Sequence, residues 1–308
     1  MSSEQVAILL STYNGATYLP EQLDSLVAQT HTAWTVYASD DGSSDQTLDV
    51  LRQFQERLGP ERLVILKGPQ RGFAANFLSL LARAEVQARY FAFCDQDDLW
   101  MPDRLERGLR WMRQHPQDKP ALFCSRTQLV DAHGHPLGMS PEFRRLPCFE
   151  NALVQSIAGG NTMLINAHAR DLLRQTRLSD HIVSHDWWAY IVVSGCGGSV
   201  GYDPVPTIGY RQHGNNIIGS NNSFRDRLVR LRKLLHGTFR CWTDYNLQAL
   251  SPFRARLTSE NRSRLELFEQ GRRAPLWKRL KLIHDSGVHR QTLLGNLGLT
   301  AAAILQRI

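Results

Sequence analysis

Three carboxylates directly follow a strongly apolar segment of the chain. Residues 90–94 are aromatic, alanine or cysteine, and Asp95, Asp97 and Asp98 come next. In an extended backbone, side chains two positions apart point the same way, so Asp95 and Asp97 can share one hard cation. Mg²⁺ sites commonly combine one or two carboxylates with phosphate oxygens. The structural alternative is that Asp95 caps a turn and Asp98 caps the following helix.

A second acidic segment, "SDDGSSD" at residues 39–45, has the composition of a turn. A carboxylate held in such a turn, from either Asp40 or Asp41, could accept the imide N–H of a uracil or thymine ring. The spacing does not distinguish between these two residues. Turn formation alone also accounts for the composition. The segment therefore supports nucleotide binding only in combination with the other motifs.

A third segment, "SHDWW" at residues 184–188, places a carboxylate beside two indole rings. Trp187 and Trp188 could stack on a sugar ring while Asp186 takes a proton from a hydroxyl group as a general base. The structural alternative is that Asp186 caps a helix whose tryptophans belong to the core. The segment by itself supports both interpretations equally.

The segment "YRQHGNN", residues 210–216, adds a guanidinium and an imidazole. Arg211 suits a phosphate group and His213 suits a divalent metal ion. A single histidine is more often structural than a ligand. An acidic pair and a phosphate-binding type of residue in the same chain favour the ligand interpretation here.

Alternating strands and helices must position these groups. Apolar runs predict strands at 5–15, 34–40, 62–68 and 90–98, and helical spacing predicts helices at 16–30, 46–59, 76–88 and 102–115. This alternation predicts an α/β fold with a mainly parallel sheet flanked by helices. Ligands of such sheets bind at the carboxyl ends of the strands. Polar segments follow all four predicted strands, so this edge is expected to hold a polar ligand with a cation.

The alternation becomes looser from about residue 120 to 215. Residues 121–137 resemble a β-hairpin with its turn at 131–136, and residues 159–166 resemble another strand. A helix is expected at 184–195, and a strand that runs into a loop is expected at 203–219. Arginine-rich helical segments follow at 224–237 and 273–287.

The net charge of +7 is unevenly distributed. Residues 225–308 contain 17 Lys and Arg against 6 Asp and Glu, a balance of +11, whereas residues 1–224 contain 19 against 23, a balance of −4. The basic segment could contact nucleic acid or anionic lipid head groups. An acidic sheet edge would repel a nucleic-acid backbone, so nucleic acid is not expected as a partner.

Composition and missing motifs exclude several classes of protein. Five scattered cysteines without a C-x-x-C pair predict reduced thiols in a cytoplasmic protein. The N-terminus lacks the basic region and cleavage site of a signal peptide, and no apolar run reaches the roughly 18 residues of a membrane span. The absence of a P-loop, of G-x-G-x-x-G and of G-x-S-x-G disfavours ATP hydrolysis, dinucleotide binding and a serine hydrolase.

Five motifs, taken in order, resemble those of inverting glycosyltransferases of family 2, which have the GT-A fold: "ILLSTYNGATYLPEQLDSLVAQT", "SDDGSSDQT", "DQDDLWMPDRL", "HDWW" and "YRQHGNN". The resemblance covers roughly residues 5–220 and points to bacterial rhamnosyltransferase-like enzymes that build lipopolysaccharide or other cell-surface glycans. Together with the charge distribution it predicts a GT-A domain at 1–224, with a nucleotide-binding half at 1–115 and an acceptor half at 116–224. A basic helical C-terminal extension is expected at 225–308.

The resemblance implies a role for each matching residue. Asp186 matches the catalytic base, and Asp97 matches a metal ligand. His213 matches a late metal or pyrophosphate ligand, and Arg211 matches a residue near the diphosphate. Donor-binding roles are implied for residues that follow the predicted strands: Thr12, Tyr13, Asn14, Asp40 or Asp41, and Asp95.

The chain departs from the family pattern at Gln70-Arg71-Gly72, where many relatives have Asn-x-Gly. Arg71 is therefore expected to contact the nucleotide in place of the usual loop contacts. The third carboxylate of the acidic cluster, Asp98, is expected to be structural.

The implied activity is a single in-line displacement that needs Mg²⁺ or Mn²⁺. It would move L-rhamnose from dTDP-L-rhamnose to a hydroxyl of a lipopolysaccharide or other cell-surface glycan. The basic helices are expected to contact the inner face of the inner membrane, to contact an anionic lipid-linked acceptor, or to pack back on the body. The alternatives are another donor, such as a UDP-linked hexose or N-acetylhexosamine, and a nucleotide-sugar-binding protein without turnover.

Overall fold

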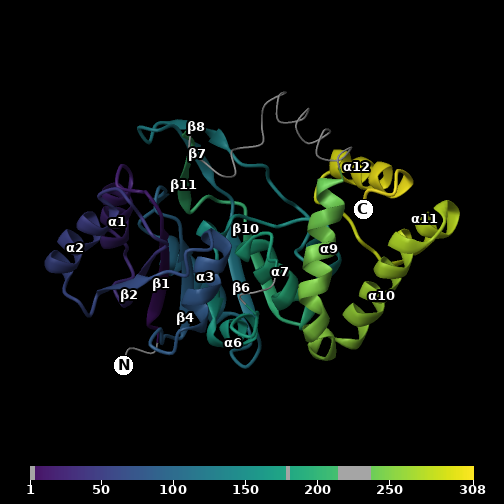
Figure 1. Cartoon of the computed structure of the whole chain (residues 1–308), viewed down its shortest axis with the longest axis horizontal. Helices are drawn as coiled ribbons and strands as arrows, with labels where there is room; N and C mark the ends of the chain where they lie inside the picture. The colour runs from purple at the N-terminus through teal and green to yellow at the C-terminus, as the bar shows by residue number, and fades with distance from the viewer. Residues whose placement is uncertain (1–3, 178–180, 214–236) are drawn as a thin grey trace.

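The computed structural model describes residues 4–177, 181–213 and 237–308, and its centre is a seven-stranded sheet (Figure 1). The strand order is β10-β6-β9-β4-β1-β2-β3. In chain order these strands are β1 Val6–Thr12, β2 Trp34–Asp40, β3 Leu63–Lys67, β4 Tyr90–Cys94, β6 Ala121–Ser125, β9 Leu164–Asn166 and β10 Ser199–Asp203. Neighbouring strands are parallel except at β9, which runs antiparallel to β4 and β6. The predicted mainly parallel sheet is therefore confirmed.

Helices cover both faces of the sheet because its strands bury alternate side chains on opposite sides. Ala7 and Leu9 of β1 belong to a core shared with α3, α6 and α7. Val6, Ile8 and Leu10 belong to a second core shared with α1, α2 and α4. The helices of this part of the chain are α1 Leu19–Val27, α2 Thr47–Leu58, α3 Phe73–Ala82, α4 Arg104–Arg113, α5 Phe149–Ala152, α6 Ala167–Leu173 and α7 His185–Gly195, with a 3₁₀ turn η1 at Gly160–Thr162.

A second, four-stranded sheet has the order β5-β11-β7-β8. Its strands are β5 Leu99–Trp100, β7 Gln128–Val130, β8 Pro136–Met139 and β11 Ile208–Arg211. The hairpin expected at 121–137 is therefore only partly correct: β6 joins the main sheet, and the hairpin consists of β7 and β8. Every residue of β6 is buried, as in a strand covered on both faces, whereas every residue of β8 is exposed.

Helices of the C-terminal region pack against the body on the side of α7 (Figure 1). They are α9 Thr238–Leu250, η2 Ser251–Arg256, α10 Ser259–Arg273, α11 Leu276–Asp285 and α12 Leu293–Ile304. The ring of Phe253 lies edge-on to Trp188, with 5.5 Å between centroids. Helix α11 confirms the helical segment expected at 273–287, whereas residues 224–236 of the other predicted segment lie outside the described residues. Among the described helices, none is long and apolar enough to cross a membrane.

A buried amide joins three elements beneath the carboxyl edge of the sheet. Asn76 of α3 is fully buried. Its Nδ2 donates to Ser11 Oγ at 2.7 Å and to the Ser39 carbonyl at 2.8 Å, and its Oδ1 accepts from Ser39 Oγ at 2.6 Å. This amide therefore fixes the spacing of β1, β2 and α3 where the polar strand ends begin.

We expect Asn76→Leu to lower the free energy of unfolding by roughly 3 kcal/mol, because it leaves the buried polar groups of Ser11 and Ser39 unpaired. Urea denaturation monitored by circular dichroism measures the change. Gln53→Leu, on the exposed side of α2, is the matched control and should change stability by less than about 0.5 kcal/mol. Equal stability of the two variants would contradict a bracing role for Asn76.

Candidate active site

The parallel register brings the polar ends of β1, β2 and β4 together. Thr12 and Asp40, the last residues of β1 and β2, are direct neighbours in the ladder, and Leu10 of β1 lies opposite Cys94 of β4. The acidic segment that starts at Asp95 therefore begins beside the loop that follows β1. Motifs more than eighty positions apart along the chain share one edge of the sheet.

The side chain between the two predicted functional carboxylates holds this edge together. Gln96 Oε1 accepts the Tyr13 amide at 2.8 Å, and Gln96 Nε2 donates to the Tyr13 carbonyl at 3.0 Å. A Cβ atom at position 15 would lie 2.1 Å from Gln96 Oε1, so Gly15 leaves the room that this contact needs. The loop after β1 and the acidic loop after β4 are thus joined through one amide.

The two carboxylates of the "SDDGSSD" turn differ in the hydrogen-bonding capacity that they retain. Asp40 accepts four hydrogen bonds: from Thr12 Oγ1 and Ser43 Oγ on Oδ1, and from the Gly42 and Ser43 amides on Oδ2. A carboxylate offers about four acceptor positions, so Asp40 is saturated by its own turn. Asp41 accepts two hydrogen bonds, one on each oxygen, so each oxygen keeps one acceptor position.

The loop between β3 and α3 is anchored on Asp41. The Gln70 amide donates to Asp41 Oδ1 at 2.6 Å, and the Gly72 amide donates to Oδ2 at 2.8 Å. Gln70 has a positive φ of 57°, which turns the loop sharply at this point. Arg71, between Gln70 and Gly72 in the chain, is exposed. The departure from the family pattern therefore puts an exposed arginine in the loop that Asp41 anchors.

Residues 12–14 reach the edge in different ways. Thr12 is almost fully buried, and its hydroxyl donates to Asp40 at 3.1 Å. The predicted contact of the Thr12 side chain with the nucleotide is therefore wrong, because this buried hydroxyl is used to hold Asp40. Tyr13 is 57% exposed, and Asn14 is exposed with its Oδ1 accepting from the Ser44 amide at 2.8 Å. The ring of Tyr13 is the larger open surface of this loop.

Four carboxylates gather where β4 ends and α7 begins. Burial, followed by the charges of Asp98, Asp97 and Asp186, raises the pKa of Asp95 well above its usual range. Asp186, in the first turn of α7, is therefore close enough to Asp95 to act on it electrostatically. Repulsion of this kind disfavours further negative charge and favours a cation or a proton donor in the same space.

Asp98 is the structural member of the acidic segment. It is fully buried, accepts from Asn161 Nδ2 at 2.5 Å and accepts from the Arg211 amide at 3.2 Å. Burial and the neighbouring charge of Asp97 raise the pKa of Asp98 to about 8, although these hydrogen bonds oppose the shift. Its contacts link the acidic loop to η1 and to β11.

Asp97 and His213 are brought together as the sequence predicted, with 2.8 Å between Asp97 Oδ2 and His213 Nε2. Both side chains keep some exposed surface, and the imidazole lies at a tilt against the ring of Tyr18, with 4.7 Å between centroids. A carboxylate oxygen and an imidazole nitrogen are a suitable donor pair for Mn²⁺ or Mg²⁺. In the described part of the chain, no group of three or more His, Cys, Asp and Glu residues could hold a metal ion. The pair thus fits an ion that takes its remaining ligands from elsewhere.

The predicted phosphate contact of Arg211 is wrong. This side chain is fully buried, and its guanidinium donates to the Asp97 carbonyl, the Ala132 carbonyl and Glu21 Oε2 at 2.9, 2.6 and 2.6 Å. A buried guanidinium without exposed surface cannot reach a diphosphate at the sheet edge. Arg211 instead fixes the acidic loop against the end of β11, two positions before His213.

The predicted sugar-stacking role of Trp187 and Trp188 is also corrected. Trp188 is fully buried with its Nε1 donating to Thr176 Oγ1 at 2.8 Å, and Trp187 is 7% exposed with its Nε1 donating to the Ala152 carbonyl at 2.7 Å. Both rings point into the core because α7 packs against the sheet with that side. Asp186 is the member of the motif that remains partly exposed.

A buried histidine lies directly before Asp186. His185 stacks on Phe77 at 3.9 Å, and neither ring nitrogen has a hydrogen-bond partner. A Cβ atom on Gly160 would lie 2.2 Å from His185 Nε2, so the glycine of η1 closes the ring in. Burial lowers the pKa of His185 to about 4, and the ring is therefore neutral at pH 7.

Sequence reasoning missed Gln96, Asn161 and His185. Gln96 stands between Asp95 and Asp97 in the acidic motif. Asn161 follows Gly159 and Gly160, a pair that indicates only the start of a strand. The only indication of these three residues in the sequence is that each is a polar residue within or next to a recognised segment. Their partners, such as Tyr13 for Gln96, are far away in the sequence and could not be inferred from it.

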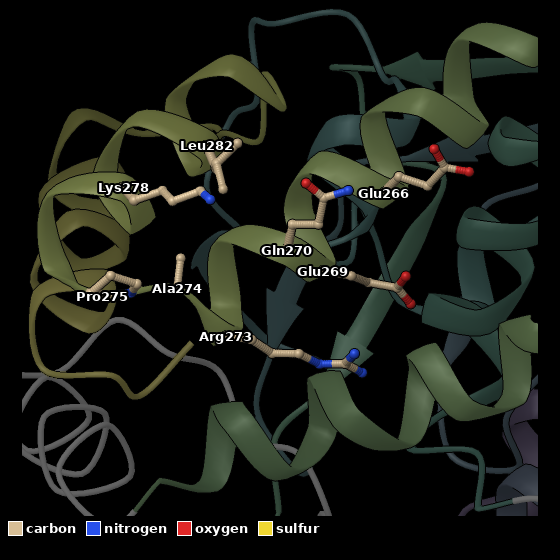
Figure 2. A pocket seen from close by; sticks show the side chains of 8 residues that line it. All are labelled: Glu266, Glu269, Gln270, Arg273, Ala274, Pro275, Lys278 and Leu282. Carbon is tan, nitrogen blue, oxygen red and sulfur yellow. The ribbon is translucent and has the colours of Figure 1, made fainter.

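One depression on the described surface lies away from this edge, between α10 and α11 (Figure 2). Figure 2 shows acidic and basic side chains around it, and Glu269 forms an ion pair with Arg254. Its lining residues come from the C-terminal helices alone, and none of them belongs to a motif predicted to do chemistry. We therefore do not assign donor binding to this depression.

Comparisons with known proteins agree with this arrangement. Residues 7–169, more than half of the chain, match the family model described as Glycosyl transferase family 2. The chain is 27% identical over 236 residues to the dTDP-rhamnosyl transferase RfbG of Shigella flexneri, covering 72% of this chain and 78% of that protein. It is 30% identical over 161 residues to the putative teichuronic acid biosynthesis glycosyltransferase TuaG of Bacillus subtilis, covering 52% and 62%.

Solved structures share the fold at low sequence identity. TarS 1–349 of S. aureus, in complex with UDP-GlcNAc, has a TM-score of 0.55 at 13% identity, covering 98% of this chain and 89% of that one. The mannosyltransferase PcManGT of Pyrobaculum calidifontis, in complex with GDP-Man and Mn²⁺, has a TM-score of 0.51 at 14% identity, covering 98% and 85%. The predicted GT-A fold is confirmed by these similarities.

The neutral state of His185 predicts how stability depends on pH. Its pKa is lower in the folded protein than in the unfolded chain, so between pH 6.5 and about 4 the unfolded chain binds a proton that the folded protein does not. The neutral His185 ring therefore stabilises the folded protein fully above pH 6.5. This contribution to the free energy of unfolding decreases as the pH falls, by about 3 kcal/mol near pH 4. His185→Leu should lose less stability on acidification than the wild type.

Denaturant unfolding at pH 7 and pH 5 measures this difference. His284→Leu, at a site where the histidine side chain is 89% exposed, should keep the wild-type pH dependence. An unchanged pH dependence in His185→Leu would show that the buried ring is not the group responsible.

Proposed function

The chain belongs to glycosyl transferase family 2 and is a glycosyltransferase, and from this premise we propose that it transfers L-rhamnose from dTDP-L-rhamnose. The acceptor group is a hydroxyl of a lipopolysaccharide or another cell-surface glycan. The reaction is a single in-line displacement with inversion at the anomeric carbon. The observation that carries this proposal is the contact of Asp97 with His213 at the carboxyl edge of the sheet, with Asp186 close enough to raise the pKa of Asp95 there.

Asp186 is the proposed catalytic base. It stands in the first turn of α7, partly exposed, and Oδ1 accepts the Trp187 amide at 2.7 Å. This hydrogen bond orients the carboxylate, and the second oxygen can accept a proton from the acceptor hydroxyl as that oxygen attacks the anomeric carbon. The leaving nucleoside diphosphate departs from the opposite side of the sugar, so no covalent intermediate with the protein is required.

The nucleotide is proposed to lie over the loops that follow β1, β2 and β3. Asp41 rather than Asp40 is the proposed acceptor for the imide N–H of the pyrimidine, because Asp40 already accepts four hydrogen bonds. Tyr13 and Asn14 offer exposed surface to the base and ribose, and Arg71 offers an exposed cation in the loop that Asp41 anchors. Asp95 is proposed to lie near the ribose.

Asp97 and His213 are proposed to hold Mg²⁺ or Mn²⁺ when the donor is bound. Two protein ligands leave coordination positions for diphosphate oxygens and water, which suits an ion that arrives with the donor. When bound, the ion would neutralise the charge that develops on the leaving diphosphate. Arg211 positions this pair by holding the Asp97 carbonyl and the strand that precedes His213.

The identity of the donor is supported by one relative. RfbG, named as a dTDP-rhamnosyl transferase, aligns with 72% of this chain. A UDP-linked hexose or N-acetylhexosamine remains the alternative donor, since the structurally similar TarS is in complex with UDP-GlcNAc. A nucleotide-sugar-binding protein without turnover would not need a base at position 186.

The proposed location is the cytoplasm, with peripheral contact at the inner face of the inner membrane. The proposed organisation is a GT-A domain at 1–224 and a basic helical extension at 225–308. The net charge of +11 in residues 225–308 supports the membrane contact, because a positively charged segment is attracted to anionic lipid head groups.

Asp186→Asn should lower the rate of sugar transfer by about 100-fold or more, because a general base of this kind contributes at least that factor. Nucleotide binding should be retained, because the donor loops are untouched. Transfer of labelled sugar and a thermal shift with dTDP measure the two properties. The control is Asp171→Asn, at an exposed position on α6. Equal activity in Asp186→Asn and the wild type would contradict the assignment of the base.

dTDP with Mn²⁺ should stabilise the protein by about 2.7 kcal/mol at a ligand concentration 100-fold above the Kd. Asp97→Ala should lose the part of this stabilisation that depends on Mn²⁺ and keep the part that dTDP produces without metal. A thermal-shift series with dTDP, UDP and GDP, each with and without Mn²⁺, tests donor class and metal together. Failure of both dTDP and UDP to stabilise the protein with metal present would overturn the proposed function.

A further inference from the structure

Helix α12 turns its large apolar side chains outward. Leu293, Leu294 and Leu297 are 79%, 72% and 62% exposed, whereas Ala302 and Ala303 are buried. A surface helix ordinarily buries its large apolar residues and exposes polar ones. Here the small residues face the core, and no charged residue lies between 293 and 304. Within the described part of the chain this apolar side is not covered.

A segment distant in the sequence extends the same surface. Leu146 is 86% exposed and follows Arg145. The Arg145 amide donates to Gln291 Oε1 at 3.1 Å, and the Arg145 carbonyl accepts from Gln291 Nε2 at 3.2 Å. This pair of hydrogen bonds fixes Leu146 close to the start of α12. We refer to Leu146, Leu293, Leu294 and Leu297 as the leucine patch.

Basic residues border the leucine patch. The side chain of Arg144 is 84% exposed, and Arg145 is exposed as well. Glu142 pairs with Arg144 at 3.1 Å, and residues 286–308 contain no Asp or Glu side chain. The surface around the leucines is therefore positively charged, which is complementary to anionic head groups.

The adjoining helix α11 has residues of the same kinds. Trp277 is 81% exposed, and Lys281, one helical turn further along α11, is exposed as well. The buried guanidinium of Arg279 donates to the Ala303 carbonyl at 2.9 Å and so holds α11 against α12. Tryptophan together with lysine is typical of residues at the boundary between a bilayer and water.

We propose that the leucine patch inserts into the head-group region of a lipid bilayer that contains anionic lipids. Exposed leucines supply the apolar contact and the bordering arginines supply the electrostatic attraction, the two contributions on which interfacial binding depends. A second copy of the chain fits less well. The four leucines expose well under the roughly 800 Å² per partner that a stable dimer buries, and a two-fold axis through the patch would bring arginines together.

Vesicle flotation with the full chain tests the proposal. The wild type should bind vesicles of phosphatidylcholine with about 30% phosphatidylglycerol, bind pure phosphatidylcholine more weakly, and lose affinity as salt is raised. The variant Leu293→Ser/Leu294→Ser/Leu297→Ser should bind the anionic vesicles at least about tenfold more weakly. The matched control replaces three exposed apolar residues on other elements: Val27→Ser/Leu137→Ser/Val205→Ser.

Three outcomes would overturn the proposal: no binding of the wild type, equal binding by the wild type and the leucine variant, or a wild-type dimer in sedimentation equilibrium that the leucine variant abolishes. Circular dichroism establishes that both variants are folded. The inference gives a surface to the membrane contact in the proposed function, but its test uses no donor. The dTDP thermal shift of the leucine variant should equal that of the wild type, so vesicle binding and donor binding can fail separately.

Discussion

The crowding of negative charge at the end of β4 is the constraint on which the rest of the site depends. Asp95, Asp97 and Asp98 follow a fully buried strand, and Asp186 approaches from α7. The chain relieves this repulsion differently at each position. Asp98 is buried against Asn161 with its pKa raised, Asp97 contacts His213, and Asp95 keeps its raised pKa. A cation that accompanies an anionic donor would complete the balance, which is why this edge suits a metal–diphosphate complex.

The loops around these carboxylates are held by side chains that bind backbone groups. Gln96 joins the loop after β1 to the acidic loop, and Asp41 holds the loop before α3. Arg211 joins the acidic loop to β11. Such bonds fix loop positions before a ligand arrives, which lowers the conformational entropy that binding must overcome. Polar residues of the motifs therefore hold one another's loops in place.

The C-terminal helices contain residues that pack into the core and residues that remain exposed, and the net charge of the region does not distinguish the two. Phe253, Leu265 and Phe268 enter the core that contains α7, so part of this region stabilises the catalytic domain. The basic residues Arg272 and Arg279 are also turned inward, where they bind carbonyl groups. The leucines of α12 face the opposite way and remain exposed. The positive charge of the region is thus partly structural and partly available at the surface.

Hydrophobic periodicity and turn composition in the sequence were sufficient to predict the alternating elements, the mainly parallel sheet and the edge at which its polar groups meet, because these depend on neighbours a few positions apart. The resemblance of the motifs to the family, and not the periodicity, assigned Asp97 and His213 to the same site, and the structure brings them into contact. Tertiary structure alone decided which polar side chains are exposed. It buried Arg211, Trp187 and Trp188, saturated Asp40 but not Asp41, and assigned Gln96 to Tyr13. Burial and hydrogen-bond saturation depend on partners that are distant in the chain, and residue type and spacing carry no record of those partners.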